Sequence, residues 1–374
     1  MSLQDFLQPV STYALSHDRG FPDGQIGCHI AVWDAPDPDV EGADVILVGV
    51  DEERGSGRRQ GEISGPDTIR EYFYGSYYWH PEVRLADAGN IRKGATLHDT
   101  YAALRHVVGE LRGAGKTVVI LGGSHDLTLA QYQVYRERKQ LIEATCVDAL
   151  IDLNTDSPLR QDNFLLSMLT EDPNYVRHYN HIGFQSYYVH PRMLETLDKL
   201  HFDCYRVGKV REQLDEMEPV IRHSDLLSID IAAMANSAAP AARVSPNGFS
   251  GEEMCQLARY AGLSDRLSTL GIYGYRPALD RDDLTAKQIA QMLWYFIDGR
   301  QKSLQEAPLE DRDHYNEFHT VFGEVESTFL QSKRTGRWWM QLPNRHYIAC
   351  SYSDYVKASH NEIPERWFRA QERE

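Results

Sequence analysis

The sequence predicts an α/β fold in which strands alternate with helices and form a mostly parallel central sheet. Short apolar runs rich in β-branched residues recur along the chain, and such runs are typical of strands buried on both faces. Segments with helical spacing of apolar residues lie between them, and this alternation builds parallel βαβ units. With 374 residues, 42% of them hydrophobic, the chain can form one large domain or two modest ones around a sizeable core.

Seven segments are predicted as strands. The clearest cover residues 45–50, 117–121, 148–152 and 226–231, and weaker ones cover 181–184, 204–207 and 268–273. The helical patterns cover residues 97–112, 127–140, 252–261 and 285–297. We expect Gly113 and Gly115 to end the first of these helices and Gly299 to end the last.

The chain after residue 300 has a different pattern. We divide the sequence into an N-terminal segment (1–42), an α/β domain (43–300) and a C-terminal extension (301–374). In the extension, residues 318–331 and 338–342 are predicted to be extended and joined by a turn at 333–336, followed by 347–350 and 363–368. We expect a β-hairpin that packs on the core or forms an oligomer contact. The adjacent Trp338 and Trp339 are expected to serve packing.

Charge and composition exclude several classes of partner. The net charge is −16 with no Lys- or Arg-rich run, so a nucleic-acid partner is not expected. No signal peptide and no apolar run of membrane-spanning length is present, so we expect no membrane partner and a cytoplasmic location. Five scattered cysteines without a CxxC pair favour a reducing compartment: Cys28, Cys146, Cys204, Cys255 and Cys350.

Polar residues at predicted strand ends form the candidate site. His125 follows Gly122 and Gly123, which allow a tight turn out of the sheet. Because the carboxyl ends of parallel strands share one edge, His125 is expected to meet carboxylates from two later strand ends. These carboxylates belong to Asp152, Asp156 and Asp230.

One imidazole and three carboxylates suit a hard or borderline divalent cation such as Mn²⁺ or Mg²⁺. Each residue alone is more easily explained as a cap, a turn residue or a hydrogen-bonding loop residue. The four together favour a metal site. If no cation is bound, the carboxylates repel one another, so one of them should have a raised pKa, or a nearby Lys or Arg should fill the gap.

The segments around these residues resemble the ureohydrolase family, which includes arginase, agmatinase and formimidoylglutamase. Gly122-Gly-Ser-His125 resembles its Gly-Gly-x-His motif, Asp152-Leu-Asn-Thr-Asp156 its Asp-x-His-x-Asp motif, and Ser228-Ile-Asp-Ile-Ala232 its Ser-x-Asp-x-Asp motif. Supporting similarities lie at residues 65–70, 87–90 and 277–286. The resemblance implies an arginase-like, three-layer α/β/α domain, a homo-oligomer (a trimer or hexamer) and a site for two Mn²⁺ ions.

The departures from the family pattern fall on one ion. The resemblance implies that His125, Asp152, Asp156 and Asp230 hold the first ion. The positions of the two ligands exclusive to the second ion carry Asn154 and Ala232. The family's guanidinium-clamping Glu aligns with Gly274. We therefore expect one Mn²⁺ or other divalent ion per chain, and no second ion.

Three functions remain open, and the catalytic residues are not assigned. The first is a degenerate ureohydrolase, weak or inactive as an arginase or agmatinase. The second is an active metal-dependent C–N hydrolase of a linear amidine such as formimidoylglutamate. There Asn154 would be a ligand, with Asp126, Asp162 or His190 completing the shell. The third is a non-catalytic regulatory or structural subunit. Small amidine or guanidino compounds are the expected ligands if the protein is active.

Overall fold

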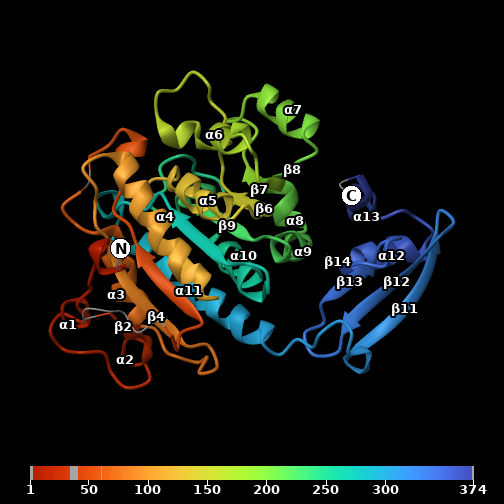
Figure 1. Ribbon diagram of the computed structural model, residues 1–374, viewed down its shortest axis with the longest axis horizontal. Helices are drawn as coiled ribbons and strands as arrows, with labels where there is room; N and C mark the ends of the chain where they lie inside the picture. The colour runs from red at the N-terminus through yellow and green to blue at the C-terminus, as the bar shows by residue number, and fades with distance from the viewer. Residues whose placement is uncertain (1–2, 34–40, 60, 373–374) are drawn as a thin grey trace.

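The computed structural model describes residues 3–33, 41–59 and 61–372, so residues 1–2 and 34–40 of the predicted N-terminal segment lie outside it. Its main sheet has ten strands in the order β1-β4-β3-β5-β10-β9-β6-β7-β8, with β2 paired to β4 (Figure 1). Every pair is parallel except β1 with β4. The strands are β1 Leu7–Gln8, β2 Ala31–Val32, β3 Val45–Gly49, β4 Leu85–Ile91, β5 Thr117–Leu121, β6 Ile142–Val147, β7 Val176–Phe184, β8 Asp203–Arg206, β9 Leu226–Asp230 and β10 Thr269–Tyr273.

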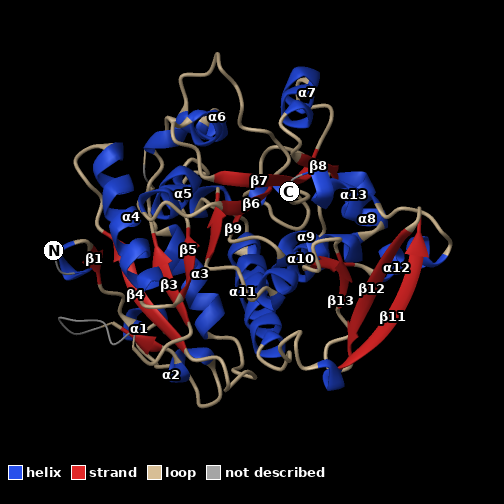
Figure 2. Ribbon diagram, turned by 45° about the vertical axis from the view of Figure 1, so that its right-hand side comes forward, coloured by secondary structure: helices blue, strands red, loops and turns tan. Residues whose placement is uncertain are grey.

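Helices cover both faces of this sheet (Figure 2), which confirms the predicted α/β/α class. The α-helices are α1 Thr12–Leu15, α2 Ile26–His29, α3 Gly65–Tyr74, α4 Leu97–Gly113, α5 Leu127–Glu137, α6 Phe164–Thr170, α7 Pro191–Lys199, α8 Val207–Glu212, α9 Met217–Arg222, α10 Gly251–Leu263, α11 Leu284–Ser303, α12 Tyr352–Ser359 and α13 Glu365–Glu372. No helix in the described ranges is both long and apolar enough to cross a membrane.

Alternate side chains of each central strand enter two separate hydrophobic cores. In β3, Val45 and Leu47 pack with α3, α10 and α11 on one face, whereas Ile46 and Val48 pack with α4 and α5 on the other. This alternation is the two-residue period of a strand. Because both faces are covered, the strands appear in the sequence as continuous apolar runs.

The strand predicted at residues 148–152 is displaced in the structure. β6 covers Ile142–Val147, and Asp148 comes directly after it. The start of this strand is hard to recognise in the sequence, because the charged residue Glu143 interrupts the apolar run. In the structure the Glu143 carboxylate pairs with Arg177 at 2.5 Å. The displacement places Asp148, not Asp152, at the strand end.

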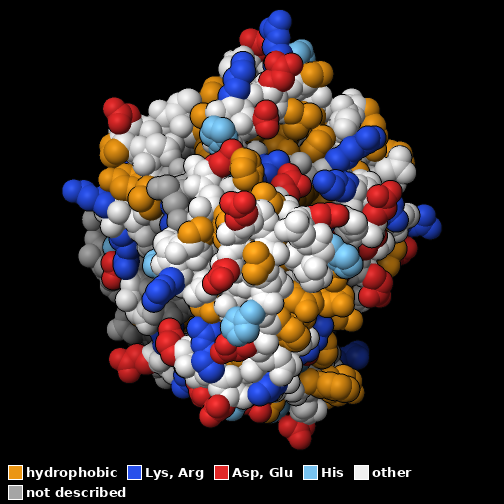
Figure 3. Space-filling view, turned by 90° about the vertical axis from the view of Figure 1, so that its right-hand side faces the viewer, with side chains coloured by type: hydrophobic (Ala, Val, Ile, Leu, Met, Phe, Trp, Pro, Cys, Tyr) orange, Lys and Arg blue, Asp and Glu red, His pale blue; other side chains and the backbone are white. Residues whose placement is uncertain are grey.

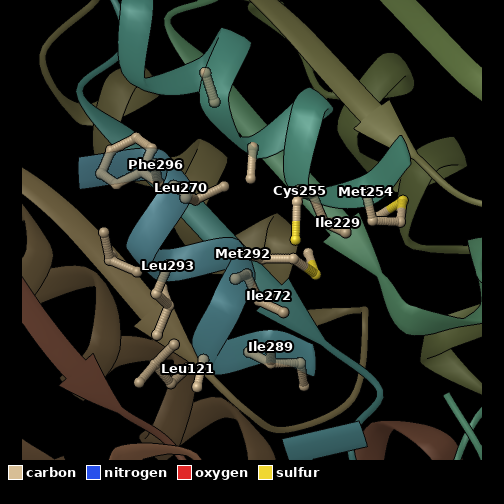
Figure 4. Close-up of a cluster of buried hydrophobic side chains, with 14 of the residues drawn as sticks. Leu121, Ile229, Met254, Cys255, Leu270, Ile272, Ile289, Met292, Leu293 and Phe296 are labelled. Atoms are coloured by element: carbon tan, nitrogen blue, oxygen red, sulfur yellow. The ribbon is translucent and has the colours of Figure 1, made fainter. Parts of the chain in front are cut away.

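Gly299 does not end α11, which continues to Ser303. A Cβ at Gly299 would lie 2.2 Å from the backbone oxygen of Arg259 in α10, and a Cβ at Gly262 would lie 2.0 Å from the oxygen of Phe296. These glycines therefore allow close contact between the two helices. Apolar side chains of α10 and α11 then pack over β5, β9 and β10 (Figure 4).

The C-terminal extension forms a second, antiparallel sheet in the order β11-β12-β13-β14, with β11 Tyr315–Phe322, β12 Val325–Ser332, β13 Trp338–Gln341 and β14 Tyr347–Cys350. The predicted turn at residues 333–336 does join two paired strands, β12 and β13. The segment predicted as one extended run at 318–331 instead folds back at Gly323 and Glu324, which both have positive φ. Residues 363–368 are not extended, because α13 begins after Pro364 and buries Trp367.

Two buried arginines join the extension to the α/β domain. The Arg222 guanidinium lies over the Trp339 ring, 4.5 Å from its centroid, and donates to the Trp338 carbonyl at 3.0 Å. Arg337 reaches in the opposite direction and donates to the Leu263 carbonyl at 2.6 Å. The adjacent tryptophans thus serve packing, as expected.

His223 adds a contact that depends on its charge. Its Nε2 accepts a hydrogen bond of 2.8 Å from the Ala349 backbone N–H of β14, so this nitrogen carries no proton. Burial lowers the pKa of His223 to about 4. An ordinary histidine in the unfolded chain titrates near 6.5. The unfolded chain therefore binds more protons between these values, and stability is lost as the pH falls from about 6.5 toward 4.

We predict that His223→Gln weakens this pH dependence, because the glutamine oxygen can accept the same hydrogen bond without titrating. Between pH 7 and pH 5, His223 should account for about 1 to 2 kcal/mol of the fall in unfolding free energy. Denaturant unfolding at both pH values, with chelator present, measures this difference. The exposed His346→Gln should retain the wild-type pH dependence, and an equal fall in wild type and His223→Gln would contradict the prediction.

Candidate metal centre

Four neighbouring strands bring the candidate site to one edge of the sheet. In the order β5-β10-β9-β6, the segments at their carboxyl ends contribute His125, Gly274, Asp230 and Asp148. His125 and Asp230 are 105 positions apart in the chain, but the parallel register aligns their strand ends. This edge is where open parallel sheets bind ligands.

The turn after β5 fixes the position of His125. Gly122 and Gly123 have φ values of +90° and +77°, and a Cβ at either would lie 3.1 to 3.2 Å from the Val50 carbonyl. Only glycine adopts this backbone without strain. The turn places His125 just beyond the carboxyl end of β5. There the imidazole is buried, 4.8 Å from the Phe164 ring by centroid distance.

Three carboxylates surround Nδ1 of His125. The nearest oxygens belong to Asp152 at 3.1 Å, Asp148 at 3.2 Å and Asp230 at 3.7 Å. The other ring nitrogen, Nε2, lies 2.9 Å from Oγ of Ser228, which in turn contacts Oγ1 of Thr128 at 2.6 Å. The hydroxyls therefore hold the ring so that Nδ1 points toward the acids.

Backbone groups orient two of the carboxylates. Asp230 Oδ1 accepts a hydrogen bond of 2.7 Å from the Ala232 N–H, and Asp148 Oδ1 accepts one of 3.2 Å from the Leu150 N–H. In addition, the His181 imidazole contacts the Asp148 carbonyl at 3.1 Å. The acids are consequently held in place by the strand ends themselves.

The charges of the cluster perturb one another. Burial opposes protonation of His125, but the contacts with Asp148 and Asp152 outweigh it and raise the pKa of His125. Burial raises the pKa of all three aspartates. For Asp230, burial and the charge of Asp148 together raise the pKa to about 6. The repulsion expected between the carboxylates is therefore present.

These residues fit a divalent cation. One ligand atom each from His125, Asp148 and Asp230 lie within 4.8 Å of one another. His125 Nδ1 is buried and makes no hydrogen bond of acceptable geometry, although carboxylate oxygens surround it. Ligands about 2.1 Å from an octahedral ion are about 3 Å apart, close to the spacing found around Nδ1. A nitrogen and carboxylate oxygens are donors that Mn²⁺ accepts.

The structure differs from the sequence prediction at Asp156 and Asn154. Both are exposed in the turn beyond Asp152, where the Asp156 N–H donates to Asn154 Oδ1 at 3.1 Å. Asp148, which the sequence analysis did not select, is in the cluster instead. The sequence contained a signal for it: Asp148 and Asp152 repeat the spacing of Asp152 and Asp156, and only knowledge of where β6 ends distinguishes the two pairs.

The three other residues considered as additional ligands serve different roles. Asp126 stands before α5 and accepts a hydrogen bond from the Tyr101 hydroxyl. Asp162 accepts from Ser157 Oγ at 2.6 Å. His190 caps α7 by accepting from the Arg192 N–H. In the described part of the chain none of them is in the group formed by His125, Asp148 and Asp230, which Asp152 adjoins through its contact with His125 Nδ1.

Apolar or absent side chains border the cluster. Leu150 lies midway between Asp148 and Asp152, and Ala232 is buried two residues after Asp230. Gly274 has a φ of +83°, and a Cβ there would lie only 2.5 Å from Asp230 Oδ1. A glutamate at position 274 would thus require both a strained backbone and displacement of Asp230.

Comparison with known proteins identifies the family of this chain. Residues 43–298 match the arginase family. The chain belongs to the arginase family. The match runs from just before β3 almost to the end of α11, whereas β1 and β2 of the main sheet and the C-terminal extension lie outside it.

Similar arginase-family proteins include several formimidoylglutamases. Formimidoylglutamase from Staphylococcus aureus is 24% identical over 250 residues, which are 64% of this chain and 80% of that protein. The crystal structure of Trypanosoma cruzi formiminoglutamase with Mn²⁺ has a TM-score of 0.64 at 17% identity, covering 70% of this chain and 94% of that one. Bacillus subtilis formimidoylglutamase has a TM-score of 0.66 at 20% identity, covering 76% and 95%. The structural similarities show a shared fold.

Replacement of Asp148 provides a direct test of the cluster. We predict that Asp148→Asn lowers the metal content of protein loaded with Mn²⁺ and desalted from about one ion per chain to nearly none, because a bound carboxylate charge is lost. Asp156→Asn removes the same charge in the exposed turn and should leave the content unchanged. Elemental analysis measures the Mn²⁺ content of both variants. Loss of Mn²⁺ from Asp156→Asn but not from Asp148→Asn would show that Asp156 is the ligand.

Gly274 provides a second test, through the position of Asp230. Gly274→Ala and Gly115→Ala both place a side chain at positive φ, but only position 274 faces a neighbour, since a Cβ at Gly115 meets nothing within 4 Å. Each should cost about 1 to 2 kcal/mol of stability. Only Gly274→Ala should also weaken Mn²⁺ binding, by about 10-fold or more. Equal Mn²⁺ affinity in the two variants, measured by calorimetry, would argue against this role of Gly274.

Proposed function

We propose that this arginase-family protein holds one divalent ion, with Mn²⁺ the first choice, and is weak or inactive as an arginase or agmatinase. The ligands would be His125, Asp148, Asp152 and Asp230, in place of the set that includes Asp156. When bound, such an ion polarises a substrate and lowers the pKa of water. The single observation that carries the proposal is that Leu150 and Ala232, two positions after Asp148 and Asp230 in the chain, have no side-chain ligand atom.

The revised alignment follows from the structure of the β6 end. Asp148-Ala-Leu-Ile-Asp152 fits the family's Asp-x-His-x-Asp spacing, with Leu150 at the histidine position instead of Asn154. Ala232 remains at the final position of the Ser-x-Asp-x-Asp motif. Neither side chain offers a ligand atom, so a second ion would lack both of its own protein ligands.

The position of Gly274 weakens the case for guanidine hydrolysis further. The family places a carboxylate there to orient the guanidinium, and such charge-assisted positioning contributes strongly to catalysis. In this chain Asp230 fills the space that a side chain would need. We therefore expect arginine and agmatine to be poor substrates.

A second candidate is hydrolysis of a linear amidine such as formimidoylglutamate. The similarity to formimidoylglutamases favours this substrate class. A single divalent ion is sufficient in many hydrolases, so the loss of the second site does not by itself prevent the reaction. A non-catalytic regulatory or structural subunit that joins active relatives in a mixed oligomer is the remaining alternative, and it predicts no product from any amidine.

Restoring the second site tests the proposal. We predict that Leu150→His with Ala232→Asp raises the Mn²⁺ content from about one to about two ions per chain, because two ligand side chains return. Asn154→His with Ala232→Asp, based on the earlier alignment, should remain at about one. Elemental analysis of wild type and both double variants measures this outcome, and two ions in wild type would overturn the proposal.

Product release from the same three proteins separates the candidate functions. Wild type should release urea from arginine or agmatine at least about 100-fold more slowly than an active arginase-family enzyme assayed in parallel. The reason is that both the guanidinium-orienting carboxylate and the second ion would be missing. Formamide release from formimidoylglutamate by wild type would favour the second candidate. Absence of product from all three substrates, with one ion bound, would favour the non-catalytic subunit.

A further inference from the structure

A cavity lies at the sheet edge opposite the metal centre. It has a volume of about 540 Å³, within the usual range for small-molecule sites. Glu143, His178 and Asp203, at the amino ends of β6, β7 and β8, line it on the side of the α/β domain. The β13–β14 turn and helices α12 and α13 of the C-terminal extension form the other wall.

The extension that closes this cavity is held by ion pairs. Arg369 of α13 pairs with Asp203 at the start of β8. Arg366 lies 3.4 Å from Glu216 of the α/β domain and 3.1 Å from Asp354 of α12. Since the extension lies outside residues 43–298, the cavity is a feature of this chain and not of the arginase fold alone.

The acidic residues that line the cavity already have cationic partners. Glu143 pairs with Arg177 at 2.5 Å, and Glu365 pairs with Arg369 at 2.9 Å. The three other lining carboxylates, Asp203, Glu216 and Asp354, make the arginine contacts described above. The negative charge of the walls is thus largely compensated, although the whole chain has a net charge of −16.

Two lysines on opposite walls of the cavity have no carboxylate partner among the described residues. Lys209 of α8 belongs to the α/β domain, Lys357 of α12 belongs to the extension, and both are exposed. Neither makes an ion pair or side-chain hydrogen bond with another residue in the described ranges. Figure 3 faces the side of the molecule that carries the extension, where basic, acidic and histidine side chains are intermingled.

We propose that this cavity binds a small organic molecule with two oxyanion groups, one held by Lys209 and the other by Lys357. Such a ligand would bridge the α/β domain and the extension. Carboxylate and phosphate groups both satisfy this chemistry, because each accepts hydrogen bonds from an ammonium group. The proposal does not depend on the function of the metal centre, which lies at the opposite sheet edge.

The experiment uses the full chain and two probes that represent the two oxyanion sources, inorganic pyrophosphate and citrate. Because both probes chelate metals, calorimetric titrations are made with metal-free protein. Wild type should bind at least one probe with a stoichiometry of about one, and the preferred probe identifies the phosphate or carboxylate source. Absence of saturable binding of either probe would overturn the proposal.

Charge-removing variants locate the binding site. Lys209→Gln and Lys357→Gln should each lower the affinity for the preferred probe at least about 10-fold, because each removes one ammonium contact. Lys302→Gln removes the same charge from α11 outside the cavity and should change the affinity less than about 2-fold. An equal loss of affinity in all three variants would indicate only non-specific charge attraction and would overturn the proposal.

Asp148→Asn at the other sheet edge supplies the remaining control. It should leave probe affinity unchanged, since Asp148 lies in the metal centre. A loss of probe binding in this variant would show that the probe binds at the metal centre, and would overturn the proposal. Thermal unfolding of each variant verifies that the chain remains folded.

Discussion

The parallel pairing of β5, β10, β9 and β6 is the constraint on which the rest of the molecule depends. Its register brings distant segments to one edge, so that His125, Asp148 and Asp230 meet although 105 positions separate the first from the last. The same pairing requires helices on both faces, because every central strand presents apolar side chains in both directions. The candidate metal centre is therefore a consequence of the sheet, and a change in one strand's register would separate its ligands.

The close approach of Gly274 to Asp230 shows how this constraint limits the chemistry. β10 lies directly beside β9, and Asp230 occupies the space into which a side chain at position 274 would project. A carboxylate that orients a guanidinium cannot simply be added here. Gly274, Leu150 and Ala232 offer no side-chain ligand atom, whereas Nδ1 of His125 has carboxylate oxygens of three aspartates within 3.7 Å.

Much of the fold could be predicted because buried parallel strands give strong apolar signals, as residues 117–121 show by matching β5 residue for residue. The site was predicted less completely. Three aspartates repeat at intervals of four, and a strand whose second residue is Glu143 gives no clear start from which to choose between Asp148 and Asp156. Tertiary packing explains another difference, since Gly299, which local propensity marks as a helix end, instead lies in the close contact between α10 and α11.

β7 connects the two edges of the sheet discussed above. Its first residues, including His178 and Asn180, line the cavity beside the extension, whereas His181 contacts the Asp148 carbonyl. His178, Asn180 and His181 are all buried and hydrogen-bonded. The β7 residues that line the cavity are different from the one that contacts the Asp148 carbonyl. We therefore expect a ligand in the cavity to stabilise the docking of the extension while leaving metal affinity unchanged.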